Sequence, residues 1–405
     1  MTTILNGAPL PEATICLETA IDRALGLRSL MIWLQDNNFN FYLGGGCVRD
    51  ALLQEEFIND VDIYLETTDT TQWQQLIHAK KTDWESLSKT LVHKVDVISC
   101  YSAVDYSQQA DFSINSLLYD PIKQKIIGSD SALADVHQKI LRPLHCSYFI
   151  TSPKAFTRAF RQAAQFNLNL HPQLQDLAKH YGHIQLMATP DQAPKVFAEF
   201  IHFLSLPKAS ALLKEFISWG LLNGILPEGS SHQCINPRTH QTFLEDHLAW
   251  INTLDKRVEQ LPADEVLALT EWRSKKFSMN PNELDRFSTV KYTQLGLFRL
   301  ACLLSDLGAG VYSLDDLKEN VAPAKIRSAS ESLINNLALR HQLHHIVYSL
   351  ILNAGELALQ VEDEYSREKE SPTLFSRNDL CPKAPSRHKE DAIGLLVLAK
   401  RESFG

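Results

Sequence analysis

The sequence predicts an α+β fold in which a small mixed sheet, in the first part of the chain, is followed by an all-helical second half. Strand signals, meaning alternation or runs of β-branched residues, concentrate before about residue 150. After Pro153, apolar residues recur at helical spacing, as in PKAFTRAFRQAAQF and ASALLKEFISWGLL. A chain of 405 residues is also long enough for more than one domain.

The first part of the chain contains one clear helix signal and three strand signals. Residues 29–37 have the spacing of an amphipathic helix and end in the turn-rich DNNFN. Residues 39–43, 61–66 and 93–100 each carry the alternation or the β-branched residues of a strand. Together they favour an α/β or α+β arrangement for this region.

Changes in composition suggest four parts. Residues 227–239, PEGSSHQCINPRT, concentrate Pro, Gly, Ser and Asn and predict a boundary within the helical half. The expected domains are an N-terminal extension with one short helix over residues 1–25, a head over 26–150, a helical neck over 151–230, and a helical body and tail over 231–405.

Composition excludes several classes of protein. No apolar run approaches the roughly 20 residues that a membrane span needs, and the N-terminus lacks the pattern of a secretory signal. The seven cysteines show no CxxC pairing, which argues against zinc and against a disulfide framework, so a cytoplasmic location is expected. A net charge of −9 limits any contact with nucleic acid to a local basic groove.

A glycine-rich turn, Gly44 to Gly46, lies between an expected strand and an expected helix. Glycine lets backbone N–H groups approach a phosphate closely, and a helix N-terminus adds free donors and a favourable dipole. Arg49 falls in the first turn of that helix, where its guanidinium can form a charge-assisted pair with a phosphate. The same turn is compatible with a plain connection, so it does not by itself identify a phosphate site.

Asp60 and Asp62 form the second candidate feature. Because alternate residues of a strand point to the same side, both carboxylates lie on one face of the expected strand. Two neighbouring acids repel each other, whereas divalent cations bind oxygen ligands held in this way. In two-metal transfer of phosphoryl or nucleotidyl groups, such ions activate the attacking hydroxyl and neutralise the leaving pyrophosphate. The pair can also be structural, but its place shortly after a glycine-rich turn and an arginine favours function.

A third carboxylate is expected from a neighbouring strand. Asp96, in the segment KVDVI, has strand-forming neighbours and is the candidate. We expect it to help deprotonate an attacking hydroxyl, and the alternative is a solvent-facing aspartate.

These motifs resemble the class II tRNA nucleotidyltransferase and bacterial poly(A) polymerase family. The family's GGxVRDxLL stands here as GGCVRDALL at residues 45–53, and its DxD strand stands as Asp60-Val61-Asp62. Its RRDFTINAL motif corresponds to DFSINSLLYD at residues 111–120, and its closing segment is similar to residues 134–142. Order and spacing agree over about residues 38–165, and a looser likeness continues over residues 197–228.

The resemblance implies a nucleotidyltransferase head of the polymerase-β type, followed by a helical neck, body and tail. It implies that Asp60 and Asp62 bind Mg²⁺ as catalytic residues. The nucleotide-binding residues that we expect on this basis are Gly45, Gly46, Arg49, Asp111, Asn115, Arg158 and Arg161. Asp111 and Asn115 would share one face of a helix, and the alternative is a helix-capping aspartate with a buried asparagine.

The chain departs from the family where the nucleotide is recognised. Gln109 and Ala110 replace two arginines, and Ser152 and Ala155 replace an acid and an arginine at the start of the next helix. A charge-assisted hydrogen bond contributes about 1.5–3 kcal/mol, so losing two or three would weaken nucleotide binding by several orders of magnitude. The metal pair is thus retained while the residues that select the nucleotide are altered.

Two functions are compatible with this pattern. The first is Mg²⁺-dependent, template-independent transfer of a nucleoside monophosphate from ATP or CTP to the 3′ end of an RNA. The second is a weakened or inactive nucleotide- and RNA-binding protein on the same scaffold. The missing arginines and the negative charge favour the second, and the intact acidic pair favours the first. CCA addition and poly(A) addition are not separated, although a C-terminus that is only mildly basic favours a tRNA acceptor.

The helical half contains two further clusters of polar residues. Arg273, Lys275 and Lys276 stand beside Trp272, and we interpret them as a solvated helix face rather than an RNA contact. The histidines at positions 341, 344 and 345 have helical spacing, and without nearby acids we interpret them as surface or core residues.

Overall fold

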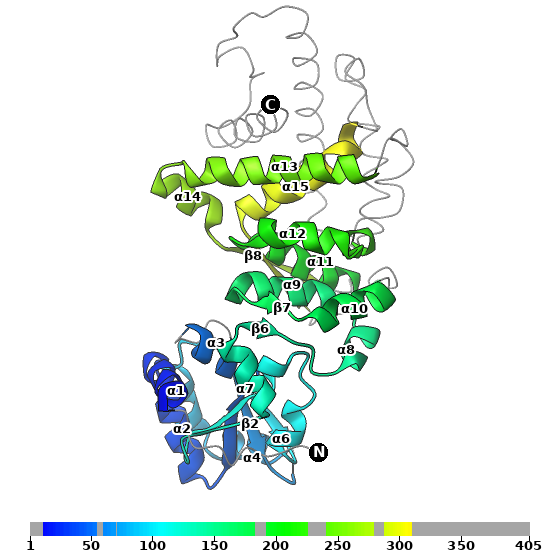
Figure 1. Ribbon diagram of the computed structural model, residues 1–405. Helices are drawn as coiled ribbons and strands as arrows, with labels where there is room; N and C mark the ends of the chain where they lie inside the picture. Colours follow the sequence, from blue (N-terminus) through cyan, green and yellow to red (C-terminus); the bar gives the residue numbers. More distant parts are fainter. Residues whose placement is uncertain are drawn as a thin grey trace, which may run out of the picture. The chain divides into compact units, whose positions relative to one another are not determined.

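The structure is a computed structural model in which residues 11–54, 60–69, 71–182, 192–225, 240–278 and 287–309 are described (Figure 1). The chain divides into two compact units. The first comprises Met1–Phe149 and Phe166–Leu177, and the second comprises Ile150–Gln165 and Ala178–Gly405.

A five-stranded mixed sheet is the centre of the first unit. Its strands are β1 (Asn40–Gly44), β2 (Val61–Glu66), β3 (Val95–Cys100), β4 (Leu118–Asp120) and β5 (Lys125–Ile127). Their order is β3-β2-β1-β4-β5, in which β2 and β3 are parallel and the other neighbours are antiparallel. The strands on either side of the glycine-rich turn and its helix are therefore adjacent in the sheet.

Helices surround this sheet, and the first of them belongs to its core. The α1 helix contacts both α2 and α3, and its Leu17 and Ile21 are fully buried. Their spacing of four residues places both side chains on one face of the helix. The helices before residue 140 are α1 (Pro11–Arg23), α2 (Leu27–Asp36), α3 (Gly46–Gln54), α4 (Gln72–Ala79), α5 (Lys81–Ser88), α6 (Ala103–Ser107), the 3₁₀ helix η1 (Ser113–Asn115) and α7 (Asp130–His137).

Three tryptophans join α2, α4 and α5, the last two of which connect β2 to β3. The rings of Trp73 and Trp84 have centroids 5.3 Å apart, and each lies 6.1 Å from the ring of Trp33. Neither α4 nor α5 contains a buried residue. Aromatic packing is therefore the main contact that we find for these two helices within the described part of the chain.

The three strands and the helix predicted before residue 101 are confirmed. The three predicted strands correspond to β1, β2 and β3, and the predicted helix over residues 29–37 corresponds to α2. After β6 (Ile140–Leu141), the chain forms α8 (Cys146–Thr151) and α9 (Ala155–Phe166). It then returns to the first unit, where β7 (Asn169–Leu170) pairs in parallel with β6. The α10 helix (Pro172–Tyr181) follows.

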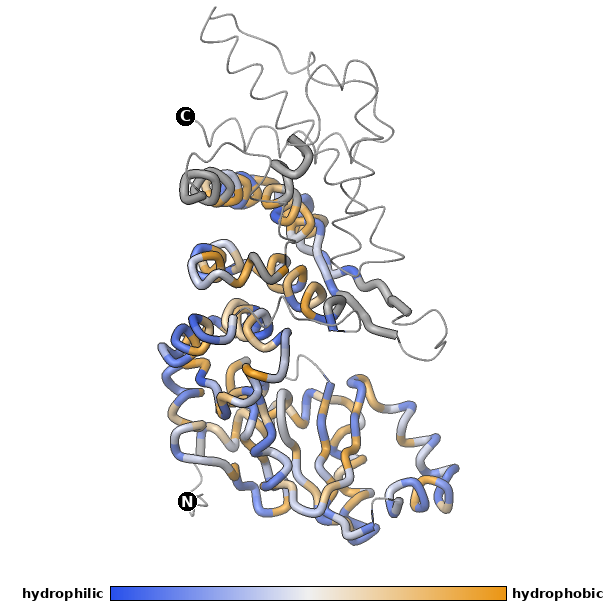
Figure 2. Tube along the Cα trace, turned by 90° about the vertical axis from the view of Figure 1, so that its right-hand side faces the viewer, coloured by the Kyte–Doolittle hydropathy of each residue, from blue (hydrophilic) through white to orange (hydrophobic). Residues whose placement is uncertain are grey.

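The second unit has an aromatic core. The ring of Phe160, on α9, lies 5.0 Å from the rings of both Phe216 and Trp219, and Phe200 stacks on Phe216 at 5.5 Å. Figure 2 shows hydrophobic and hydrophilic residues interleaved along the helices, as the periodicity of the sequence predicts. The further elements are α11 (Ala193–Leu204), α12 (Ala209–Ser218), the 3₁₀ helix η3 (Leu221–Gly224), α13 (His240–Glu259), α14 (Ala263–Thr270) and α15 (Gln294–Ala309).

The second half of the chain is mainly helical but not all-helical. An antiparallel hairpin of β8 (Arg273–Ser278) and β9 (Phe287–Tyr292) lies within it, and β9 packs against α11. The interpretation of Arg273, Lys275 and Lys276 as a helix face was therefore wrong, since they lie on β8. The pairing of β8 with β9 and the packing of β9 against α11 stabilise these strands. Neither contact can be read from the periodicity of the local sequence.

None of the described helices is both long enough and apolar enough to cross a membrane. The predicted boundary loop at residues 227–239 lies outside the described residues. The histidines at positions 341, 344 and 345 and the predicted tail beyond residue 309 lie outside them as well.

Candidate functional site

The glycine-rich turn gives three side chains room to approach the backbone. Gly45 has a φ of 66°, in the left-handed region, and a Cβ there would stand 3.0 Å from a carboxylate oxygen of Asp62 and 3.0 Å from the Tyr64 hydroxyl. A Cβ on Gly46 would stand 3.2 Å from a guanidinium nitrogen of Arg49. The turn therefore faces both the predicted acid and the predicted arginine.

Three carboxylates lie at one end of the parallel pair β2 and β3. Asp62 of β2 is in register with Gly44 on one side and with Asp96 of β3 on the other. Asp60 immediately precedes β2. The side chains of Asp60 and Asp96 are 55% and 44% exposed, whereas Asp62 is half-buried. We call Asp60, Asp62 and Asp96 the carboxylate edge.

The carboxylate edge holds more negative charge than nearby cations compensate. Burial, followed by the charges of Asp96 and Asp60, raises the pKa of Asp62 to about 6, although Lys94 and Arg49 act in the opposite direction. A raised pKa means that the ionised form of Asp62 is destabilised where it stands. A further cation at this edge would remove that cost.

Lys94 is a member of the site that the sequence analysis missed. Its ammonium nitrogen lies 2.5 Å from Oδ2 of Asp96 and 3.2 Å from Oδ2 of Asp60. Strand alternation places Lys94 and Asp96 on one face, and the backbone N–H of Val61 donates to the Lys94 carbonyl at 2.8 Å, which brings Lys94 beside Asp60. The alternation was visible in the sequence, but the register that brings Lys94 to Asp60 was not.

The carboxylate edge has the chemistry of a site for a divalent cation. Its donors are carboxylate oxygens, which hard cations prefer, and its charge is incompletely neutralised. Among the described residues, however, no three Asp, Glu, His or Cys side chains stand close enough to form a ready-made metal site. The edge therefore fits such a cation by its donor atoms and charge, with rearrangement of side chains.

Arg49 is buried rather than exposed in the first turn of α3. Its Nε and Nη2 donate to Oδ1 of Asp50 at 2.9 and 2.5 Å, and its Nη1 donates to Oδ1 of Asn115 at 2.7 Å. The guanidinium also lies over the ring of Phe166, 4.3 Å from the centroid. Contact between Arg49 and a nucleotide stays a prediction, while these bonds indicate that Arg49 orients Asn115.

Asp111 and Asn115 are brought together, although not by the helix that we expected. Asn115 Nδ2 donates to Oδ1 of Asp111 at 2.7 Å, and the same oxygen accepts from the Phe112 backbone N–H at 2.9 Å. Only Ser113–Asn115 is helical, as the 3₁₀ turn η1. Both predicted residues are buried. Hydrogen bonds therefore link Asp50, Arg49, Asn115 and Asp111 in one continuous chain.

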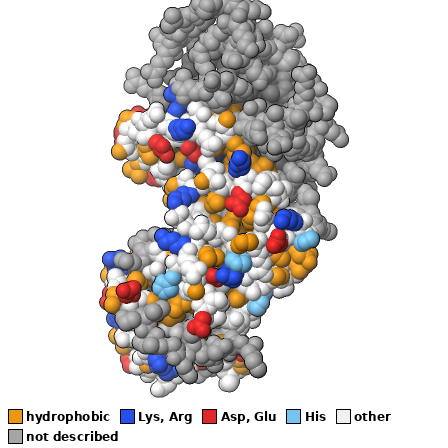
Figure 3. Space-filling model, in the orientation of Figure 1, with side chains coloured by type: hydrophobic (Ala, Val, Ile, Leu, Met, Phe, Trp, Pro, Cys, Tyr) orange, Lys and Arg blue, Asp and Glu red, His pale blue; other side chains and the backbone are white. Residues whose placement is uncertain are grey.

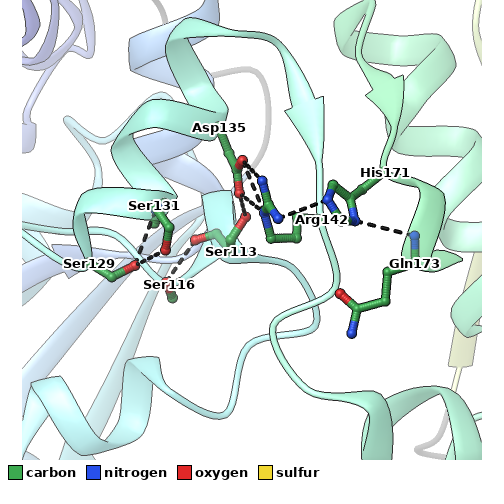
Figure 4. A network of polar contacts seen from close by, with 9 residues as sticks. Ser113, Ser116, Ser129, Ser131, Asp135, Arg142, His171 and Gln173 are labelled. Carbon is green, nitrogen blue, oxygen red and sulfur yellow. Dashed lines mark hydrogen bonds and ion pairs between the residues drawn. The ribbon is translucent and has the colours of Figure 1, made fainter. Parts of the chain in front are cut away.

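A second polar network holds η1 in place (Figure 4). Ser113 donates from Oγ to Asp135 at 2.6 Å and from its backbone N–H to the Arg142 carbonyl at 3.0 Å. Arg142 donates from Nε and Nη2 to the buried Asp135 carboxylate, at 2.9 Å in each case, and its Nη1 lies 2.8 Å from Nε2 of His171. Burial and the Arg142 charge lower the pKa of His171. The position of Asn115 thus depends on α7 and on Arg142, which directly follows β6, as well as on its own turn.

Arg158 and Arg161 lie in the second unit and share one acidic partner. Glu199 of α11 accepts from Arg161 and lies 3.6 Å from Arg158 Nη1. Burial alone would raise the pKa of Glu199, but Arg161 and Arg158 outweigh burial and lower it. His202, one turn later on α11, lies 4.8 Å from the ring of Trp272, and burial followed by the Arg161 charge lowers its pKa to about 3. Glu199 and His202 were not predicted, because no local pattern links α9 to α11.

Charged side chains are interspersed on the face that Figure 3 shows. In the described part of that face, Lys and Arg alternate with Asp and Glu and do not gather into one continuous basic strip. Any contact with nucleic acid through this face would thus rely on a few local cations.

Comparison with known proteins shows which proteins the chain is similar to in sequence. The chain is 27% identical, over 204 residues, to a CC-adding tRNA nucleotidyltransferase from Synechocystis, and the match covers 47% of each chain. The chain thus matches about half the length of this curated relative. No protein-family model matches the chain.

Solved structures agree on the fold. A tRNA-processing enzyme in its apo form superposes with a TM-score of 0.56 at 16% identity, covering 98% of this chain and 90% of the other. A Thermotoga maritima CCA-adding enzyme complexed with tRNA superposes with a TM-score of 0.50 at 14% identity, covering 100% and 99%. These similarities confirm the resemblance to tRNA nucleotidyltransferases and the fold class that the motifs predicted.

Proposed function

We propose that this relative of the tRNA nucleotidyltransferases transfers a nucleoside monophosphate, from CTP or ATP, to the 3′ end of an RNA, with tRNA as the acceptor. The curated relative is a CC-adding enzyme, so CTP is the first nucleotide to test. An acceptor of this kind also favours the cytoplasm as the place of action. The observation that carries the proposal is the undercompensated carboxylate edge beside the glycine-rich turn.

In the proposed reaction, the 3′ oxygen of the RNA attacks the α-phosphorus of the nucleotide, and the bond from that phosphorus to the pyrophosphate oxygen breaks. Asp60 and Asp62 would hold Mg²⁺, which when bound supplies electrostatic stabilisation of the charge on the reacting and leaving oxygens. Asp96 would accept the proton of the attacking hydroxyl. It stands in register with Asp62, on the neighbouring strand, where a hydroxyl held at this edge can be reached.

The glycine-rich turn would receive the triphosphate. Gly45 and Gly46 leave the backbone of the turn without side chains, directly at the start of α3, where a helix N-terminus favours negative charge. Asp111 and Asn115 would line the ribose and triphosphate side of the pocket. Arg49 would set the position of Asn115 through their hydrogen bond.

Arg158 and Arg161 remain the proposed cationic contacts to the nucleotide from the helical unit. Glu199 keeps the two guanidinium groups close together. To bind a triphosphate, the guanidinium groups would exchange their contacts with Glu199 for contacts with phosphate oxygens. Without the acid and arginine replaced by Ser152 and Ala155, selection of the base would be weaker. The competing function, a nucleotide- and RNA-binding protein without activity, would follow if this exchange does not occur.

The proposal is tested by incubating the purified full-length chain with each labelled nucleoside triphosphate, Mg²⁺ and deacylated tRNA that ends before, within or after CCA. Incorporation of CMP or AMP at the 3′ end, absent in a double variant Asp60→Ala/Asp62→Ala, is the expected result. Incorporation that persists in the double variant would reject the assigned site. No incorporation with any nucleotide, together with tRNA binding in a gel-shift assay, would favour the inactive binding protein.

A further inference from the structure

A lysine pairs with two acids of the carboxylate edge, one that the proposed function assigns to a divalent cation, Asp60, and one that it assigns to proton transfer, Asp96. Lys94 Nζ contacts Oδ2 of Asp96 at 2.5 Å and Oδ2 of Asp60 at 3.2 Å, so one ammonium joins two acids from different strands. Its position follows from the parallel register of β2 and β3 together with alternation along β3.

The ammonium and a divalent cation compete for these oxygens. An ammonium group only donates hydrogen bonds, so Lys94 cannot be a ligand of a cation. Two positive charges held a few ångströms apart also repel each other, and both would draw on the same Oδ2 lone pairs. Binding of a cation through Oδ2 of Asp60 therefore favours withdrawal of Lys94, which also releases Asp96.

Lys94 can withdraw at low cost. Its side chain is 64% exposed, and both of its carboxylate partners are about half exposed, so each ion pair is a surface pair that contributes little. A lysine carries its charge on a flexible four-carbon stem, which allows the ammonium to move without a change in the backbone.

We propose that Lys94 is an internal counter-ion of the carboxylate edge, which competes with the divalent cation and leaves Asp60 and Asp96 when that cation binds. The inference rests on the proposed function, because it takes the carboxylate edge as the cation site. It adds a residue that sets how tightly the site binds its cation. Before binding, the lysine limits the repulsion among the three acids, and after binding the cation takes over that task.

The test measures binding of Mn²⁺ alone, by electron paramagnetic resonance, to the full-length chain without nucleotide or RNA. Lys94→Met removes the charge and keeps most of the stem, whereas Lys94→Arg keeps the charge. Lys89→Met, at the exposed end of α5, is the matched control. Because the Lys94 variant loses two surface ion pairs that compete with the cation, we expect it to bind Mn²⁺ roughly fivefold to tenfold more tightly. The arginine variant and the control should remain close to the unchanged chain.

Thermal unfolding supplies a second measurement. Without metal, Lys94→Met should unfold at a lower temperature than the control variant, because three acids then face one another. Added Mn²⁺ should raise its unfolding temperature by more than it raises that of the unchanged chain. A purely structural lysine would lower the temperature without enlarging the response to Mn²⁺, and that result would overturn the proposal.

An Asp62→Asn variant separates failure of this inference from failure of the proposed function. If Mn²⁺ binding depends on Asp62 but is equal in Lys94→Met and the unchanged chain, the lysine does not compete and only the inference falls. If Lys94→Arg binds as tightly as Lys94→Met, charge is not the cause and the inference falls as well. If no Mn²⁺ binding depends on Asp62, the cation site itself is wrong and both fall together.

Discussion

The charges of the carboxylate edge in the first unit and of Arg158 and Arg161 in the second, which we call the arginine cluster, are compensated to different degrees. At the edge, one exposed lysine pairs with Asp60 and Asp96, and the pKa of Asp62 beside them is raised to about 6. In the second unit, Arg158 and Arg161 share the largely buried Glu199, whose pKa is lowered. One site has a deficit of cations, and in the other a carboxylate stands between two arginines.

The comparison separates a site whose acids lack a compensating cation from one whose arginines already have a carboxylate between them. A half-buried carboxylate among other acids is destabilised until a cation arrives, so the edge is organised for an external charge. A largely buried glutamate between two guanidinium groups is stabilised as it stands, so an anion that binds Arg158 and Arg161 would compete with Glu199. The sequence differs between the two sites in a similar way. The Asp60/Asp62 pair of the family is retained at the carboxylate edge, whereas Ser152 and Ala155 replace family residues close to Arg158.

The largest effect is expected at Asp62. Asp62→Asn should lower kcat/KM for nucleotide transfer by at least roughly 1,000-fold, about 4 kcal/mol, because it removes a cation ligand. The same variant should unfold at a slightly higher temperature without metal, since a destabilised charge is gone. Asp105→Asn, at an exposed carboxylate of the same unit, is the control. Loss of activity accompanied by loss of stability would contradict the view that Asp62 is undercompensated.

Glu199 tests the other side of the comparison. Glu199→Gln removes the negative charge that Arg158 and Arg161 share and should lower the free energy of unfolding by about 3 kcal/mol, as breaking a largely buried pair does. Urea unfolding with and without a nucleoside triphosphate measures this. If the two arginines receive the triphosphate, the nucleotide should stabilise the variant by more than it stabilises the unchanged chain. Equal stabilisation would indicate that the cluster is structural only.

Arg49 tests whether a compensated charge within the first unit positions the site. Arg49→Lys cannot reach Asp50 and Asn115 together, because an ammonium lacks the planar fork of a guanidinium. The loss of bonds to a buried carboxylate should cost roughly 2–3 kcal/mol of stability and lower kcat tenfold or more. Lys139→Met, at an exposed site, is the comparison. Unchanged kcat in a folded Arg49→Lys variant would show that Asn115 does not depend on Arg49.

The smallest effect is expected at His202, as a pH dependence. Its pKa of about 3 in the folded chain lies below the usual value near 6.5, so the unfolded chain binds more protons between these pH values. Stability should therefore fall as pH falls below 6.5, by about 2 kcal/mol at pH 5 relative to pH 7. Urea midpoints from pH 7 to pH 5 should drop less in His202→Gln, while His180→Gln, at an exposed histidine of the same unit, should behave as the unchanged chain. Parallel pH curves for all three would contradict the assignment.

Local patterns were sufficient for much of the head. Alternation placed β1, β2 and β3 almost correctly, and the adjacency of Asp60 and Asp62 was visible without a structure. The hairpin of β8 and β9 was missed because two short polar strands stabilise each other by pairing between residues that are apart in the sequence. The expected helix through Asp111 and Asn115 was replaced by a 3₁₀ turn, because Ser113 is held by Asp135 and Arg142 from outside that turn.

By itself, the sequence determined the fold class, the glycine-rich turn and the acidic pair, because these depend on neighbours within a few residues. The tertiary structure alone decided which charges meet. Lys94 reaches Asp60 across 34 positions, Arg49 reaches Asn115 across 66, and Arg161 reaches Glu199 across 38. Coulomb interactions and hydrogen bonds act over a few ångströms in space, whatever the separation along the chain, and only folding sets those distances.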